Sequence, residues 1–257
     1  MISDTQLIDM VGKDIGIYPF VERNIEGASI FVSTSRFAWS RNSKMSIVKD
    51  GKIVIPGKDV GIILTEEAIT LNGKVSGLCL SRVVHTVEGL ILPTTPIKPG
   101  WTGKLIVSLY NTNDQPIELQ IGQKIAVVMF SMLEEKAINE DLRRSRSDIL
   151  TYIGIKTEGE EGQELKEELN KPEYTNGDIL IREMMKEEGY KEFKKRKKSW
   201  YKRLSPAFIL SSLAFIALVI TFIIKSHAQY DTNLIAALSP LALTIAINTN
   251  PFVWPRR

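Results

Sequence analysis

The chain of 257 residues has one cysteine, Cys79, and only two histidines. One thiol cannot form an intramolecular disulfide, and with two histidines it offers no zinc-ligand spacing, so a disulfide framework and a structural zinc site are excluded. We expect no metal and no cofactor. The first ten residues lack an apolar run, so no secretory signal is expected, and the bulk of the chain fits a reducing compartment.

A large excess of charge of one sign is also missing, because the formal net charge is only +3. The protein as a whole is therefore not a polyanion-binding chain. Up to about residue 130, short runs of Val, Ile and Thr alternate with Gly, Pro, Asn and Asp, which is typical of short strands joined by tight turns. Residues 57–59 are expected to form a turn and residues 60–64 a strand. The pattern predicts a mainly β domain, a jelly roll or a barrel, over residues 1–132.

One segment of this domain carries a recognisable motif. Residues 89–111 read GLILPTTPIKPGWTGKLIVSLYN. The segment resembles a hairpin and strand of the dCTP deaminase and dUTPase family, in which Pro-Gly-Trp precedes a glycine, a strand with a catalytic carboxylate, and Tyr-Asn. Further segments are similar to the family's opening helix and its other strands, in order, and they lie at residues 2–8, 15–20, 27–32, 53–57, 61–66, 117–122 and 124–130.

The resemblance implies a nucleotide pocket, but its catalytic group is replaced. Ser108 stands where the family has its carboxylate, which acts as general acid and base on the attacking water. A serine hydroxyl cannot serve as that base unaided. Residues 81–90, aligned with the family motif GRSSLARxGL, keep Arg82 and place valines at two serines and at the second arginine. We therefore expect no enzyme activity; the alternative is that His85 or Glu88 has taken over the role of the carboxylate.

The remaining polar groups are candidates for ligand binding. The Arg82 guanidinium offers a fixed fork of donors to phosphate, and an ordinary surface ion pair is the alternative. Trp101 is either a structural anchor of its turn or a platform for a base. The resemblance places nucleotides at subunit boundaries of a trimer, so a homo-oligomer, trimeric or larger, is expected. The candidate ligand-binding residues are Arg82, His85, Thr94, Thr95, Lys98, Trp101 and Ser108.

Composition changes abruptly after residue 130. Residues 133–203 are charged and lack the β-branched rhythm, so they are expected to bury too little apolar surface to form a core. Within them, residues 149–155 are a candidate docking strand. Residues 176–198 are a candidate helix with apolar Ile179, Ile181, Met184 and Met185. We predict a helical or partly flexible connector that ends in a basic juxtamembrane run.

That basic run, residues 191–203, precedes an apolar segment. Residues 206–224 are uncharged and long enough to cross a hydrocarbon layer, so the basic run indicates a cytoplasmic anchor near anionic lipids and not nucleic-acid binding. A second, weaker apolar segment follows, which gives a membrane part over residues 204–254 with spans at about 205–225 and 233–254. The alternative is one span plus an interfacial helix.

The orientation follows from the basic flanks. Because residues 191–203 and 256–257 are basic and the loop between the spans is not, the β domain and both termini are expected in the cytoplasm, on the inner membrane. Asn248 and Asn250 would be costly against lipid and should face a partner helix or water. The residues expected at or in the membrane are Trp200, Tyr201, Asn248, Asn250 and Trp254.

Three functions are compatible with this layout. The first is a membrane effector whose inactive β domain binds a nucleotide and controls a membrane-disrupting hairpin. Possible ligands include a cyclic oligonucleotide. This layout resembles the two-span β-domain effectors of bacterial anti-phage nucleotide signalling. The second is a membrane-tethered dCTP deaminase or dUTPase. The third is a pseudoenzyme scaffold for a protein partner, which would be favoured if Arg82, Thr94 and Lys98 pointed away from any cavity.

Overall fold

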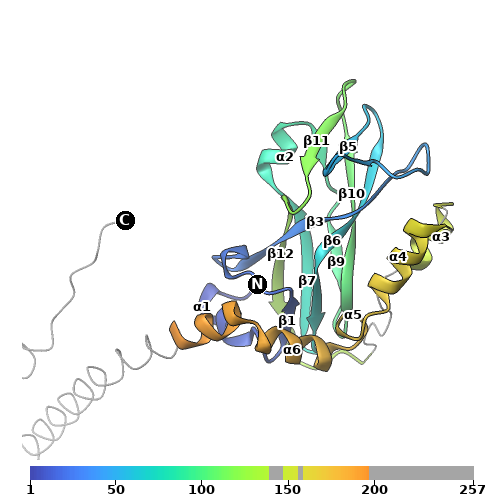
Figure 1. Ribbon diagram of the computed structural model, residues 1–257. Coiled ribbons are helices and arrows are strands. Elements are labelled where there is room, and N and C mark those ends of the chain that lie inside the picture. The colour runs from blue at the N-terminus through green and yellow to red at the C-terminus, as the bar shows by residue number, and fades with distance from the viewer. Residues whose placement is uncertain (139–146, 156–158, 197–257) are drawn as a thin grey trace, which may run out of the picture. The chain divides into compact units, whose positions relative to one another are not determined.

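The computed structural model describes residues 1–138, 147–155 and 159–196 (Figure 1). The chain divides into two compact units, Met1–Lys191 and Glu192–Arg257. Only residues 192–196 of the second unit are described, whereas most of the first unit is described.

The first unit is built mainly from strands, which confirms the expected mainly β class. Its helices are α1 (Asp4–Met10), the 3-10 turn η1 (Glu22–Asn24), α2 (Val83–Val87), α3 (Ser147–Tyr152), α4 (Glu160–Leu169), α5 (Pro172–Thr175) and α6 (Gly177–Lys186). Its strands are β1 (Ile15–Tyr18), β2 (Ile25–Glu26), β3 (Ser29–Ser40), β4 (Val48–Lys49), β5 (Lys52–Ile55), β6 (Val60–Leu71), β7 (Val75–Ser81), β8 (Leu90–Ile91), β9 (Thr95–Ile97), β10 (Thr102–Asn111), β11 (Ile117–Gln120) and β12 (Lys124–Met132).

Two antiparallel sheets form the β domain. The main sheet has nine strands in the order β8-β10-β6-β3-β12-β7-β9, with β1 added on β6 and β2 on β3, and the smaller sheet has the order β11-β5-β4. The side-chain amide of Asn111, at the end of β10, donates to the carbonyl oxygens of Ile55, Pro56 and Gln115 at 2.9–3.1 Å. This buried amide therefore ties the end of the main sheet to the smaller sheet.

Local sequence explains the turns that delimit these strands. The hydroxyl of Ser3 accepts a hydrogen bond from the Gln6 amide, and the Gln6 side chain accepts one from the Ser3 amide, which is a capping box at the start of α1. The expected turn at residues 57–59 is confirmed. A Cβ at Gly57 would lie 2.0 Å from the carbonyl oxygen of Asp114, and Lys58 has a φ of 55°. The strand expected at residues 60–64 is present as the longer β6.

The helices after the β domain pack against it (Figure 1). Leu150 of α3 and Leu165 and Leu169 of α4 are buried against side chains of β3 and β6. We call this group the Trp39 cluster, and its buried members are Phe37, Trp39, Ile62, Leu64, Leu150, Ile155, Leu165 and Leu169. The prediction that this stretch buries too little for a core overlooked such packing, because a few well-placed leucines suffice when the strands supply the other side.

Two local predictions in this stretch have different outcomes. The predicted docking strand at residues 149–155 is wrong, because Ser147–Tyr152 form the helix α3. The predicted helix over residues 176–198 is confirmed in part, because α6 covers Gly177–Lys186 and ends at Glu187, whose backbone is extended. The Asn176 side chain accepts hydrogen bonds from the amides of Asp178 and Ile179. Leu180 and Met184 are its buried residues, whereas Met185 is 40% exposed.

The predicted membrane spans, at about 205–225 and 233–254, lie outside the described residues, as do Trp200, Tyr201, Asn248, Asn250 and Trp254. Within residues 1–138, 147–155 and 159–196, no helix combines the length and the apolar composition needed to cross a membrane. The two spans therefore stay predictions.

A buried carboxyl on β6 gives the fold a pH dependence that can be measured. Glu67 accepts hydrogen bonds from the amide and hydroxyl of Ser33, at 2.7 and 3.0 Å, and from the side chain of Asn24 at 2.9 Å. Burial raises the pKa of Glu67 above its ordinary value of 4.5, although the Ser33 hydrogen bonds act in the opposite direction. The folded state therefore holds this proton more tightly than the unfolded state.

We expect Glu67→Gln to gain stability relative to the unmodified protein as the pH rises from 4.5 to 7.5. A raised folded-state pKa gives a stabilising contribution that is complete below the unfolded pKa and is lost as the pH rises through the folded pKa. The glutamine variant has no such loss. Thermal unfolding midpoints of both proteins across this pH range test the prediction, and a constant or shrinking advantage of the variant would contradict it.

Candidate functional site

A cavity of about 320 Å³ lies beside β10. The cavity is lined by side chains of β7, β9 and β10, by the turn before β10, by Leu92 between β8 and β9, and by one residue of α3. β9 ends the strand path of the main sheet and β10 lies near its other end, so a shared cavity means that the sheet bends into a half-barrel. The lining residues are Cys79, Leu92, Thr95, Pro96, Ile97, Lys98, Trp101, Leu105, Ile106, Val107, Ser108 and Ile149.

Strand pairing positions the cavity wall. β9 pairs with β7 so that Thr95 lies opposite Cys79, and β10 pairs with β6 so that Ser108 lies opposite Ile62. Trp101 is 7% exposed, and its Nε1 donates to the carbonyl oxygen of Gly103 at 3.2 Å. Trp101 is therefore an anchor of its turn and also part of the cavity wall, whereas its role as a platform for a base stays a prediction.

The cavity is mostly apolar, with a few polar groups. Thr95, Lys98 and Ser108 provide two hydroxyls and one ammonium group. Burial raises the pKa of the Cys79 thiol to about 12, so this group stays protonated near neutral pH. Among the described residues that line the cavity, none has a carboxylate or an imidazole.

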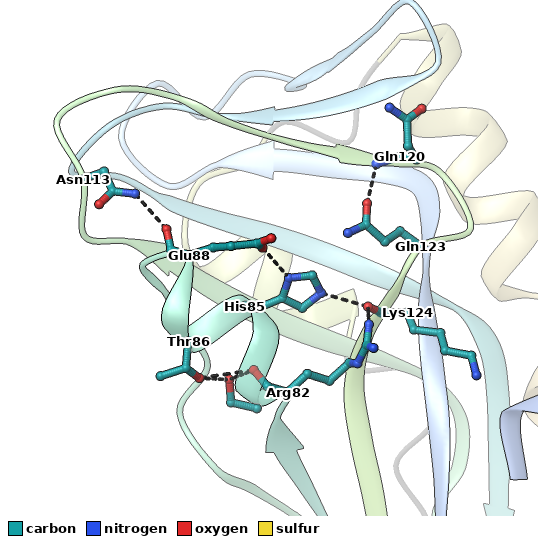
Figure 2. Close-up of polar contacts among 9 residues, drawn as sticks. Arg82, His85, Thr86, Glu88, Asn113, Gln120, Gln123 and Lys124 are labelled. Atoms are coloured by element: carbon teal, nitrogen blue, oxygen red, sulfur yellow. Dashed lines mark hydrogen bonds and ion pairs between the residues drawn. The ribbon is translucent and has the colours of Figure 1, made fainter. Parts of the chain in front are cut away.

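Arg82 and His85 lie in a second group of contacts, outside this lining (Figure 2). The Arg82 guanidinium donates to the main-chain carbonyl oxygen of Lys124 at 2.6 Å, and His85 Nε2 donates to the same oxygen at 2.9 Å. The guanidinium carbon of Arg82 and the ammonium of Lys124 lie 5.2 and 4.4 Å from the centre of the Phe31 ring. Two cations thus share one aromatic ring at this position.

His85 and Glu88, the two possible replacements for the carboxylate, contact each other in the same group. His85 is 1% exposed, and its Nδ1 lies 3.0 Å from a carboxylate oxygen of Glu88. Figure 2 shows Glu88 turned toward this ring, with its main-chain oxygen accepting from the side chain of Asn113. Neither His85 nor Glu88 is among the described residues that line the cavity with Ser108. The geometry gives no support to a transfer of the catalytic role to either residue.

The predicted ligand residues thus fall into three sets. Four of them, Thr95, Lys98, Trp101 and Ser108, line one cavity. Arg82 and His85 belong to the contacts around Lys124, and Thr94 is exposed and belongs to neither set. Reasoning from the sequence missed Ile149, because no local pattern connects α3 with the cavity. It also missed Phe31 as the partner of Arg82.

The surface next to Arg82 is apolar. Val83, Val84 and Val87 of α2 are 79%, 54% and 82% exposed. These are the positions at which the sequence has valines in place of polar and charged groups of the aligned motif. No three His, Cys, Asp or Glu side chains in the described part of the chain are grouped to hold a metal ion.

Comparison with known proteins finds relatives for the first half of the chain. Residues 1–133 match the family model described as dCTP deaminase-like. A dCTP deaminase of Pyrococcus furiosus is 34% identical over 129 residues, which are 50% of this chain and 83% of the relative. The matched region ends next to the end of β12, so the extent of the resemblance predicted from the sequence, up to about residue 130, is confirmed.

Two solved structures also align with the chain. A 2'-deoxycytidine 5'-triphosphate deaminase from Agrobacterium tumefaciens aligns at 13% identity with a TM-score of 0.43, over 51% of this chain and 48% of that one. A native dUTPase of EIAV aligns at 20% identity with a TM-score of 0.37, over 49% of this chain and 95% of that one. The alignment with the Agrobacterium protein therefore spans about half of its length.

Proposed function

The chain belongs to the dCTP deaminase-like family, and on this premise we propose that its β domain binds a nucleotide without converting it and controls a membrane-bound effector. The observation that carries the proposal is the cavity lining. It includes residues of the hairpin, Trp101 and the β10 strand, and by the resemblance of the sequence Ser108 stands in place of the family's carboxylate. A bound nucleotide is expected to stay intact in such a pocket, because no side chain of the described lining is placed to activate the attacking water.

The charge of the cavity supports an anionic ligand. Lys98 is the only lining residue with a charged side chain near neutral pH among those described, since Cys79 stays protonated. A volume of about 320 Å³ is at the lower end of the range of small-molecule sites, so one base with its sugar fits better than a larger group. The phosphates of a nucleotide, or the second half of a cyclic oligonucleotide, would then extend outside the cavity.

We propose that the binding unit is a homo-oligomer, a trimer in the simplest case. The resemblance places nucleotides at subunit boundaries. In this chain Arg82 and Lys124 carry positive charge outside the cavity of their own subunit, beside the exposed valines of α2. An Arg82 that meets the cavity of a neighbouring copy would supply the phosphate contact that the cavity lacks.

The proposed effector part is the predicted hairpin of two spans at about 205–225 and 233–254. It would place the protein in the inner membrane with the β domain and the C-terminus in the cytoplasm. Nucleotide binding would control disruption of the membrane by this hairpin, which is a function in anti-phage defence. The support for this part is the apolar sequence and its basic flanks.

The full chain should bind a nucleotide and form no product. The measurement combines calorimetry with product detection for dCTP, dUTP and cyclic dinucleotides and trinucleotides, on protein purified from the membrane fraction. Conversion of dCTP or dUTP would instead establish a membrane-tethered enzyme. Absence of any binding would favour the scaffold, which the exposed α2 valines and the position of Thr94 outside the cavity would suit. Full-length protein that stays out of the membrane fraction would contradict the effector part.

A further inference from the structure

The helices α3 and α4, which we call the helix cover, pack against the β domain beside the cavity, and α3 contributes one residue to the cavity wall. Ile149 of α3 is one of the lining residues, together with Ser108 and Lys98. The next residue, Leu150, is fully buried in the Trp39 cluster. Adjacent side chains of one short helix thus contact the cavity on one side and the core on the other, so α3 cannot shift without changing both.

Ile106 of β10 connects the same two regions. It lines the cavity and also packs against the Trp39 cluster, which contains Leu165 and Leu169 of α4. A ligand that presses on Ile106 or Ile149 therefore acts on the packing that holds the helix cover in place. Close-packed interiors transmit such a displacement, because the neighbouring side chains have no free space into which to relax.

A buried ion pair between β10 and α4 also holds α4 on the β domain. Lys104 Nζ lies 2.8 Å from a carboxylate oxygen of Glu168, and the Lys104 side chain is only 1% exposed. The ammonium group also lies 4.7 Å from the centre of the Tyr174 ring. Lys104 immediately precedes Leu105, the first cavity residue of β10. The strand that forms one wall of the cavity therefore also holds the helix cover.

Charges around this pair come from several elements. Glu66 of β6 lies 4.0 Å from Lys104 Nζ, and Lys171 binds the second carboxylate oxygen of Glu168 at 2.7 Å. Glu168 thus accepts from two lysines. Removing or reversing its charge leaves the buried Lys104 without its close partner, which is costly in a site shielded from water.

We propose that the helix cover controls access to the cavity, with the Lys104–Glu168 ion pair favouring the closed arrangement and ligand occupancy shifting the balance between closed and open. By linkage, a ligand that binds one arrangement better shifts the population by its difference in affinity. The biological meaning of this switch rests on the proposed function, since α3 and α4 connect the β domain with the C-terminal segment. Access to the cavity is a physical property that is measured without any ligand.

The single cysteine of the chain reports on the cover. Cys79 lines the cavity and is 3% exposed, so its alkylation by N-ethylmaleimide in the full-length protein requires an opening. Glu168→Lys should raise the alkylation rate at least tenfold, although residue 168 is not part of the described lining. Ile149→Ala should raise the rate as well, by removing part of the wall.

Two controls separate opening of the cover from other causes. Glu118→Lys reverses the charge of Glu118, the exposed ion-pair partner of Lys52 in the small sheet, and should leave the rate unchanged. Leu119→Ala removes a buried side chain of the same small sheet, so it reports how much alkylation general destabilisation produces. A Glu168→Lys rate equal to that of the unmodified protein, or no higher than that of Leu119→Ala at equal loss of thermal stability, would overturn the proposal.

A second readout links the cover to the ligand. If dCTP or cyclic di-AMP binds the full-length protein, Glu168→Lys should change its affinity at least tenfold, and an unchanged affinity would contradict the coupling. If neither probe binds but Glu168→Lys still accelerates alkylation, the proposed nucleotide function fails while control of access by the cover stands. The two proposals therefore fail separately.

Discussion

Replacing Lys104 by Met should lower the free energy of unfolding by about 3 kcal/mol, because the mostly buried Glu168 loses one of the two lysines that compensate its charge. Glu168 would keep only Lys171, and its side chain is 16% exposed. Chemical denaturation of the full-length protein, followed by circular dichroism, measures the effect.

The matched control is an exposed ion pair of the same type. Lys52 and Glu118 lie 2.7 Å apart with side-chain exposures of 42% and 55%, so Lys52→Met should cost less than about 1 kcal/mol. The double variant Lys104→Met with Glu168→Leu should recover most of the lost stability, since an apolar pair of similar volume avoids the unpaired charge. Equal effects of Lys52→Met and Lys104→Met would show that the buried pair does not hold α4.

The effect of Lys104→Met should also depend on pH. Burial raises the pKa of Glu168, but hydrogen bonds and the charges of Lys104 and Lys171 outweigh burial and hold it below its ordinary value of 4.5. A lowered folded-state pKa stabilises the fold above the unfolded pKa, and this contribution is lost as the pH falls through the folded pKa. The difference between the unmodified protein and Lys104→Met should therefore shrink on acidification below pH 4.5.

Ser108→Trp should weaken nucleotide binding by at least a hundredfold. Ser108 lies on β10 with its side chain exposed to the cavity, and an indole at this position would fill the space proposed for the base. Stability should change little, because the serine is not part of the buried core. Calorimetry with the nucleotide that binds the unmodified protein gives the affinity.

The control for this substitution is Ser131→Trp. Ser131 is a half-exposed serine of β12, and it does not line the cavity in the described structure. The control should bind as the unmodified protein does. If Ser108→Trp retained full affinity, the nucleotide would have to bind elsewhere, and the group around Arg82 and Lys124 would be the next candidate.

Sequence reasoning predicted the β domain because its signals are local. Apolar alternation, the turn at Gly57 and the Pro-Gly-Trp turn each lie within a few residues, whereas the pairing of distant strands such as β3 with β12 was not predicted. The helix cover was not predictable in this way. Leu150 and Trp39 lie far apart in the sequence, and residues 149–155 are as apolar as a strand, so no local pattern indicated a helix with Leu150 buried against the β domain.

The part of the candidate site that lies in one continuous segment was predictable from the sequence. Lys98, Trp101 and Ser108 come from one continuous hairpin and strand, and they line one cavity. Arg82 was assigned to the same site by alignment, but a single copy of the chain places it beside Lys124 and Phe31. Alignment identifies which residue types are present, whereas it does not say whether two of them meet within one subunit or between two.

The dual role of Ile106 limits how this protein can acquire a different ligand preference. A smaller residue at this position would enlarge the cavity and at the same time loosen the attachment of α3 and α4. Variation there is therefore expected to change selectivity and switching together, in natural evolution as in engineering. Thr95 and Lys98 contact the cavity without belonging to the Trp39 cluster, so they are the positions at which a new ligand could be selected while the response to it is preserved.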